Sequence, residues 1–168
     1  MSSSDIANAY KIHSPFEHVS SVVWQKAEYC PQIFSTDVIN RRVTEDGKLL
    51  TTRLLTMHFK LPKILHFLTK DIHTHALEIS ELDPATMKLQ QHSVNMSLSD
   101  WFMCTEHIQY SKFNEATSFE STADLTLSRS LTRMRDQFVN EFSKNAEKGK
   151  LALEQALAAT ALNLNINK

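Results

Sequence analysis

Runs rich in β-branched and other apolar residues, separated by short polar turns, fill the middle of the chain. Residues 33–43 and 49–57 flank Glu45-Asp46-Gly47, and two strand-like runs on either side of Asp-Gly predict a β-hairpin. Four further strands are predicted after this hairpin, at residues 72–82, 86–96, 102–113 and 117–127. Because only short turns separate them, these strands predict an antiparallel meander.

The spacing of apolar residues becomes helical on both sides of this meander. Ser14, Pro15 and Glu17 predict a helix over about residues 15–27, with Ser as N-cap and Glu reaching back to the cap amide. From about residue 130, side chains recur every three or four positions and predict one helix of about 30 residues. They are Leu131, Met134, Phe138, Phe142, Ala146, Gly149, Leu153 and Leu157. Packing alone does not require so long a helix, so we expect an α+β fold in which a curved antiparallel sheet grasps it.

Length and composition limit the class of protein. The chain has 168 residues, of which 42% are hydrophobic and 22% charged, as in ordinary globular domains. Two glycines and four prolines mark no domain boundary, so we expect one domain over residues 1–168. The longest stretch without a formal charge, Gln155 to Asn167, is shorter than the ~20 residues that span a bilayer.

Charge is unevenly distributed along the chain. Residues 71–128 carry nine acidic and two basic side chains, whereas both ends are basic. The chain has no block of Lys and Arg, so nucleic acid is not an expected partner, but a local basic cluster for one anionic group stays open. The first 25 residues contain one basic side chain and no long apolar run, so we expect neither a secretory signal nor a presequence.

The sequence contains no enzymatic constellation. His73 and His75 share one strand face, but no third ligand accompanies them, so no metal site is predicted. Cys104 and His107 have an odd separation, which directs them to opposite faces of a strand. Cys30 and Cys104 have no Cys-x-x-Cys spacing and are interpreted as free thiols. We therefore expect a protein that is not an enzyme and uses no cofactor.

Arginines on the predicted hairpin form a candidate anion site. If Glu45 pairs with Lys48 across a two-residue turn, Arg53 shares a face with Arg42; a loop one residue longer places it with Arg41. Either register brings two guanidinium groups to one side of the sheet. Salt bridges to the acidic middle strands and a bidentate anion site both remain open.

Two other segments depart from ordinary packing. Seven of the twelve residues at 57–68 are large and apolar, with Lys60 and Lys63 among them, which indicates a buried amphipathic helix or a lid that inserts at a membrane. On the long helix, Asn145 lies near Gly149 on the core-facing side, where small or polar side chains leave room. A cavity, an apolar flap and basic groups together fit an amphiphile with an anionic head.

Several motifs carry a resemblance to a known family. The most specific is a strand with Asp37-x-x-x-Arg41 followed by Gly47-Lys-Leu-x-Thr-x-Arg53-Leu-Leu. Further matches are Trp24-Gln25-Lys26, Glu78 to Pro84, Asn95, Glu106, Tyr110 and Phe142 to Gly149. The sequence resembles the PRELI domain proteins, the Ups-type lipid carriers of the mitochondrial intermembrane space.

The resemblance implies both a fold and a function. The fold is a curved seven-stranded antiparallel sheet around a long C-terminal helix, similar to the StAR-related and phosphatidylinositol-transfer folds, with a phospholipid enclosed as cargo. The implied function is to carry phosphatidic acid or phosphatidylserine between the mitochondrial membranes. The implied partners are the mitochondrial membrane surface and a small helical chaperone with twin cysteine motifs, in the intermembrane space.

Residue by residue, the resemblance implies a head-group site and a lid. The head-group positions are Lys26, Arg53, Lys60, Asn145 and Lys148. The lid, or membrane-insertion loop, comprises Leu61, Pro62, Ile64, Leu65, Phe67 and Leu68.

Three positions depart from the phosphatidic acid carriers. Gln32 stands where they have a histidine, and Met57 and Glu141 where they have lysines. A cavity with fewer cations makes phosphatidylserine competitive with phosphatidic acid, whose charge approaches −2. Two other hypotheses stay open: a small-molecule-binding or cyclase-like helix-grip protein, which would hold a buried acid–base pair, and a chaperone-bound interaction module without transfer activity.

Overall fold

Seven antiparallel strands form one sheet in the computed structural model, which describes residues 6–59 and 72–166. The strands are β1 (Ile6–Ile12), β2 (Ile33–Val43), β3 (Leu49–Phe59), β4 (Ile72–Asp83), β5 (Lys88–Asn95), β6 (Phe102–Phe113) and β7 (Ala116–Leu127). Their order is β1-β7-β6-β5-β4-β3-β2, so the predicted six-strand meander is confirmed. The seventh strand, β1, which the resemblance alone implied, pairs with β7, so the first strand lies beside the last.

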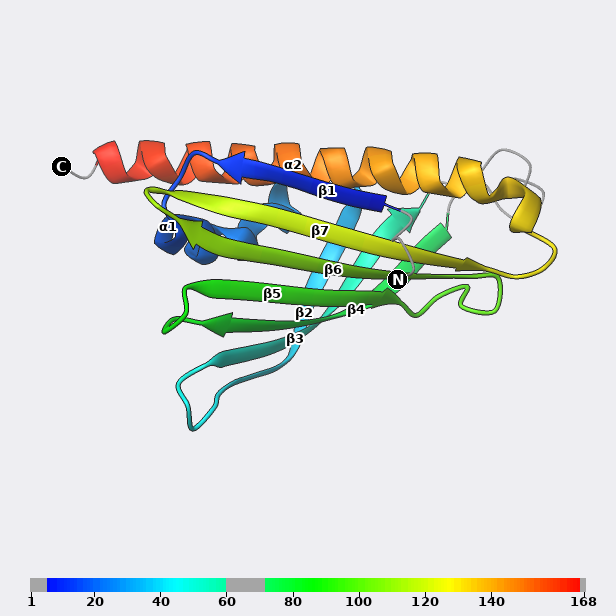
Figure 1. Ribbon diagram of the computed structural model, residues 1–168, viewed down its shortest axis with the longest axis horizontal. Helices are drawn as coiled ribbons and strands as arrows, with labels where there is room; N and C mark the ends of the chain where they lie inside the picture. Colours follow the sequence, from blue (N-terminus) through cyan, green and yellow to red (C-terminus); the bar gives the residue numbers. More distant parts are fainter. Residues whose placement is uncertain (1–5, 60–71, 167–168) are drawn as a thin grey trace.

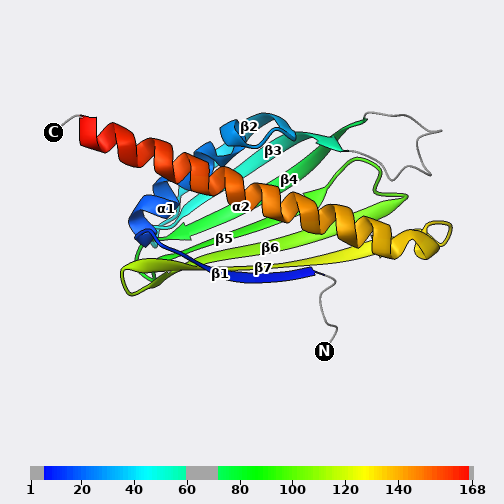
Figure 2. The ribbon, with the colours of Figure 1, turned by 90° about the horizontal axis from the view of Figure 1, so that it is seen from above.

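One long helix, α2 (Arg135–Ile166), crosses a face of this curved sheet (Figures 1 and 2). The short helices α1 (Phe16–Val22) and η1 (Val23–Tyr29) lie at one end of the sheet, and the 3₁₀ turn η3 (Thr132–Met134) precedes α2 at the other. The α+β architecture expected from the sequence is confirmed. Among the described residues, no helix combines the length and hydropathy that crossing a membrane requires.

The first helix differs from its prediction. The α-helical part ends at Val22 and continues as the 3₁₀ helix η1, where the adjacent Val22 and Val23 are both buried. The capping box is wrong, because Pro15 occupies the N-cap position and no side chain caps the helix. Ser14 instead shares a hydrogen bond with the ring of His18, at 2.9 Å.

The β2–β3 hairpin follows the longer of the two predicted loops. Thr44 N donates to Lys48 O at 2.8 Å, and Gly47 adopts a φ of +82°, a conformation that glycine tolerates without strain. Arg41 therefore lies opposite Thr51, on the face that also carries Arg53. A bulge after Val38 shifts the register in the rest of the hairpin.

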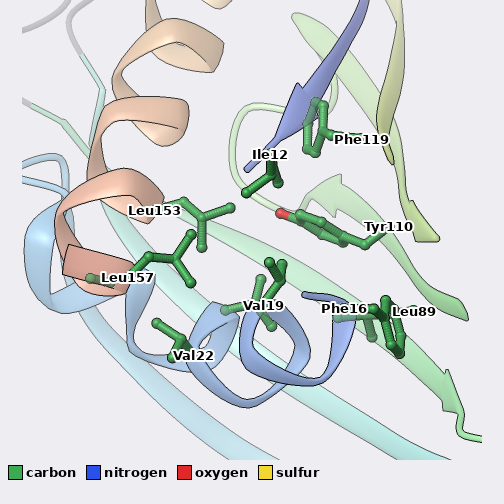
Figure 3. Close-up of a cluster of buried hydrophobic side chains, with 11 residues drawn as sticks. Ile12, Phe16, Val19, Val22, Leu89, Tyr110, Phe119, Leu153 and Leu157 are labelled. Atoms are coloured by element: carbon green, nitrogen blue, oxygen red, sulfur yellow. The ribbon is translucent and has the colours of Figure 1, made fainter. Parts of the chain in front are cut away.

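Two separate apolar clusters attach α2 to the sheet. Near its C-terminus, Leu153 and Leu157 pack toward α1 and against Tyr110 of β6 (Figure 3). Near its N-terminus, Phe138 packs with Phe102 and Leu125. The middle of α2 belongs to neither cluster, and a cavity lies beneath it.

Candidate functional site

The cavity between the concave face of the sheet and α2 has a volume of about 560 Å³, within the range of ligand-binding cavities. Side chains from β1 and from β3 to β7 form its floor, and Asn145, Ala146 and Gly149 of α2 form part of its roof. The small and polar residues noted on the long helix thus lie where they leave space. Much of the lining is apolar, with charged groups on one row of the floor.

A row of polar side chains crosses the floor of the cavity. Arg53 of β3 lies directly opposite Glu78 of β4, Glu78 opposite Ser93 of β5, and Ser93 opposite Glu106 of β6. Residues directly opposite each other in antiparallel strands share one face of the sheet. The register therefore brings four positions, from residue 53 to residue 106, into one line.

Arg53 is buried and held on two sides. Its Nε donates to Glu78 Oε1 at 3.0 Å, its Nη2 donates to the same oxygen, and its Cζ lies 5.0 Å from the centre of the Trp24 ring. Gln91 Nε2 also donates to Glu78 Oε1, at 3.2 Å. A guanidinium group has five N–H donors, so these contacts leave donors for a ligand in the cavity that Arg53 lines.

Glu106 is the second carboxylate on this row. It forms no hydrogen bond or ion pair with the described residues. Burial raises the pKa of the Glu106 carboxyl, the charge of Lys26 opposes this rise, and Glu78 adds to it. The cavity therefore contains a carboxyl group that holds a proton more readily than an exposed glutamate does, with a lysine nearby.

A hydrogen bond connects the beginning of β2 with α2 beside the cavity. Gln32 Nε2 donates to Asn145 Oδ1 at 2.7 Å, and Cys30 Sγ donates to Gln32 Oε1 at 3.3 Å. All three residues line the cavity. Gln32, one of the three positions that the resemblance marks as departures, thus contacts one of the predicted head-group residues.

The structure brings together three of the predicted head-group residues: Lys26, Arg53 and Asn145 all line the cavity. Lys148 is exposed and is absent from the lining. Lys60 and the predicted lid, residues 61–68, lie outside the described residues.

Sequence reasoning missed Lys150, which lines the cavity with its Nζ 4.7 Å from the centre of the Tyr10 ring. The helical period could have predicted this position, because Lys150 lies four residues, about one turn, after Ala146 and therefore on the same side of α2. Lys144, on the exposed surface of the same helix, pairs with Glu141 at 2.9 Å.

The residue pairs considered for catalysis and for metal binding lie in different parts of the sheet. Cys104 lines the cavity, whereas His107 contacts His92 of the neighbouring strand with 3.2 Å between their Nδ1 atoms. His73 and His75 are exposed. Over residues 6–59 and 72–166, no three His, Cys, Asp or Glu side chains are arranged to hold a metal ion.

A comparison with protein families shows to which family the chain is related. The family described as PRELI-like matches residues 17–163. The chain belongs to the PRELI-like family. This agrees with the resemblance drawn from its motifs.

Two relatives align over most of the chain. Protein UPS2, mitochondrial, of Saccharomyces cerevisiae is 28% identical, over 93% of this chain and 73% of its own length. A UPS-like protein of Schizosaccharomyces pombe is 32% identical, over 85% of this chain and 83% of its own length.

Solved structures of low sequence identity share the fold. TTHA0849 of Thermus thermophilus superposes with a TM-score of 0.64 at 16% identity, covering 92% of this chain and 97% of that one. The aromatase/cyclase ZhuI of a Streptomyces species has a TM-score of 0.56 at 11% identity, covering 93% and 92%. A STAR-related lipid transfer protein of Xanthomonas axonopodis has a TM-score of 0.54 at 8% identity, covering 92% and 89%. These likenesses concern the fold.

Proposed function

We propose that this PRELI-like protein is a non-enzymatic carrier of an anionic glycerophospholipid, phosphatidylserine or phosphatidic acid, between mitochondrial membranes. The observation that supports the proposal is the cavity under α2, where an apolar lining accompanies a buried guanidinium group with donors to spare. Acyl chains match the apolar lining, and a phosphate accepts hydrogen bonds from Arg53.

The charges around the cavity favour phosphatidylserine over phosphatidic acid. Three cationic and three carboxylate side chains line the cavity: Lys26, Arg53, Lys150, Glu78, Glu106 and Glu147. A phosphatidic acid head near −2 would leave a larger excess of negative charge among these groups than a phosphatidylserine head, whose phosphate, carboxylate and ammonium groups sum to about −1. The ammonium group of phosphatidylserine would compensate a carboxylate such as Glu106 while its phosphate binds Arg53.

The location and the protein partner are part of the same proposal. The name of the yeast relative UPS2 includes the word mitochondrial, which supports a mitochondrial location. We place the carrier in the intermembrane space, bound to a small helical chaperone with twin cysteine motifs between rounds of transfer.

A transfer assay between liposomes tests the role of Arg53. Arg53→Glu would put two buried carboxylates side by side, so the suitable variant is Arg53→Met with Glu78→Gln, which removes both charges. The matched control is Arg42→Met, on an exposed arginine of the same hairpin. We expect the double variant to lose phosphatidylserine transfer at least about tenfold and the control to keep it, since a hydrogen bond to a charged group contributes ~1.5–3 kcal/mol. Equal transfer by the two variants would refute the assignment.

A small-molecule-binding function is the second candidate, because Glu106 and Lys26 in the cavity supply an acid–base pair of the kind expected for a cyclase-like protein. Native mass spectrometry after incubation with mixed liposomes separates the candidates. Bound phospholipid supports the carrier. A cavity that takes no phospholipid, with or without the chaperone, favours a small-molecule ligand or a module that only binds its partner.

A further inference from the structure

Three large apolar side chains are exposed where β5 connects to β6. Met96 is 55% exposed, Trp101 39% and Met103 42%. All three lie within eight residues of one another, at the end of the molecule where α2 begins and opposite α1 (Figures 1 and 2). Met96 and Trp101 lie on the connecting loop and Met103 is the second residue of β6, and such water-exposed apolar side chains prefer an apolar partner.

The loop that carries Met96 and Trp101 and leads to Met103 is held by several hydrogen bonds. The Asn95 side chain donates to Ser97 O at 2.8 Å and to Phe102 O at 3.0 Å, and its Oδ1 accepts from Cys104 N at 2.7 Å. Leu98, with a φ of +60°, packs against the buried cluster that contains Phe102. The loop therefore has an anchored inner side, and the exposure of Trp101 follows from its fixed geometry.

Basic residues adjoin the loop across the turn between β7 and α2. Ser128 N donates to Trp101 O at 2.8 Å, which joins the two segments. Arg129 and Arg133 on this turn are exposed and form no ion pair with the described residues. The loop and turn contain a single acid, Asp100, against these two arginines. We define Met96, Trp101, Met103, Arg129 and Arg133 as the docking rim.

We infer that the docking rim seats the protein on an anionic phospholipid surface, with Trp101 and the two methionines at the interface and the two arginines on the phosphates. The chemistry matches the boundary of a bilayer, where amphipathic tryptophan rings lie at the level of the head groups and arginines gain from negative surface potential. The charge complementarity between Arg129, Arg133 and anionic lipid selects this occupant over an apolar protein surface.

The rim is connected to the cavity through Asn95 and Cys104. Asn95 holds the loop and also lines the cavity, and Cys104, whose amide it binds, lines the cavity as well. A protein that docks by this rim would bring the β5–β6 end of its cavity next to the membrane. The inference thus rests on the proposed carrier function and adds to it the surface by which the carrier approaches its donor and acceptor.

Flotation with vesicles tests the rim. The vesicles are phosphatidylcholine alone and phosphatidylcholine with phosphatidylserine, and the variants are Trp101→Ser with Met103→Ser, and Arg129→Gln with Arg133→Gln. The matched controls are Phe113→Ser, an exposed aromatic at the other end of β6, and Arg42→Gln. We expect the apolar variant to bind both kinds of vesicle more weakly. The arginine variant should lose roughly fivefold per arginine on anionic vesicles only, and the controls should bind as the parent does.

Lipid occupancy, measured on the same samples by native mass spectrometry, separates this inference from the proposed function. A rim variant that keeps bound lipid but no longer floats supports the rim. If the parent transfers lipid and both rim variants float as it does, the rim is refuted while the carrier stands. If no sample ever holds lipid but rim variants alone lose flotation, the carrier fails and the rim stands.

Association between copies is the remaining alternative. If the parent is dimeric in solution and the apolar variant is monomeric with unchanged flotation, the patch is an interface between copies and the membrane assignment is overturned. The arginine variant changes only exposed side chains, so it keeps the test decisive if the apolar variant unfolds.

Discussion

At the scale of single residues, the most constrained group is the Arg53–Glu78 pair. Both residues are less than one-tenth exposed, and the carboxylate also accepts from Gln91. A buried ion is tolerated only with its partner, because removing one member leaves an uncompensated charge in a poorly solvating environment. The pair thus fixes the guanidinium group beside the cavity while making each member dependent on the other.

This dependence can be measured. We expect Arg53→Met alone to lower the free energy of unfolding by about 3–5 kcal/mol, because it leaves the Glu78 charge unpaired. Adding Glu78→Gln should restore most of that loss, since both buried charges are then absent and Gln91 keeps an acceptor. Urea unfolding at neutral pH gives both values. A double variant as unstable as the single one would show that packing, and not charge, holds this site together.

Glu106 should make stability depend on pH. A carboxyl whose pKa is raised in the folded protein destabilises it when ionised, so the penalty is absent below the unfolded-state pKa of ~4.3 and complete above the folded-state value. Glu106→Gln removes this penalty and should raise the melting temperature at pH 7–8, by roughly 2–4 °C per kcal/mol, with the difference vanishing towards pH 4. Melting curves across this range test it, with Glu120→Gln on an exposed strand position as control. A pH-independent difference would contradict the assignment of the shift to ionisation.

Prediction of single residues from the sequence succeeded where the local spacing of residues determines which side of a strand or helix they occupy. Arg53 and Asn145 were placed by hairpin register and helical period together with the family motifs. The ion pair between Arg53 and Glu78 was not predicted, because it depends on the register between β3 and β4. The contact between Gln32 and Asn145 was not predicted either, because it depends on where α2 lies over the sheet.

At the scale of elements, α2 packs against the rest of the molecule through two apolar clusters, one towards each of its ends. Phe138 is anchored in one cluster and Leu153 in the other, while the segment between them roofs the cavity. Hydrophobic clusters that flank an unfilled middle indicate that this helix is placed to enclose a volume rather than to fill it.

Gly149 offers a test of this arrangement. A Cβ added there meets nothing within 4 Å, and glycine in a helix costs ~1 kcal/mol relative to alanine. Gly149→Ala and Gly149→Leu should therefore both raise the melting temperature, but only the larger side chain should reduce lipid loading by occupying cavity space. Melting curves and native mass spectrometry on the two variants check this. Equal loading would show that the roof at Gly149 does not limit the cargo.

Element prediction was accurate for strands and for α2, and less so for the first helix. The meander follows from apolar runs and short turns, which are local signals. The helix over residues 15–27 was predicted from a capping pattern, but His18 takes the hydrogen bond of Ser14, and the chain tightens to a 3₁₀ helix at Val23. Strand β1 was not predicted from its local pattern, because no turn joins it to a neighbouring strand. It pairs with β7, more than a hundred residues away in the sequence.

At the scale of the whole molecule, charged groups divide into two environments. Arg53 and Glu78 are buried in the cavity, whereas Arg129 and Arg133 of the docking rim are exposed to solvent. The acidic middle of the chain contains β4 to β7, whereas the more basic segments before and after it contain the other strands and the helices. In the proposed carrier, docking and cargo binding would therefore use electrostatic interactions that respond differently to ions in solution.

Ionic strength should separate the two steps of transfer. Exposed charges are screened over ~8 Å at physiological salt, whereas a buried pair is screened much less. Raising salt should therefore lower flotation on anionic vesicles and the transfer rate far more than the amount of lipid already bound. Flotation, fluorescent-lipid transfer and native mass spectrometry across one salt series measure all three, with neutral vesicles as the control that salt should not affect. If docking were equal on neutral and anionic vesicles at every salt concentration, apolar insertion of Trp101 and its neighbours alone would drive association, and Arg129 and Arg133 would have no part in it.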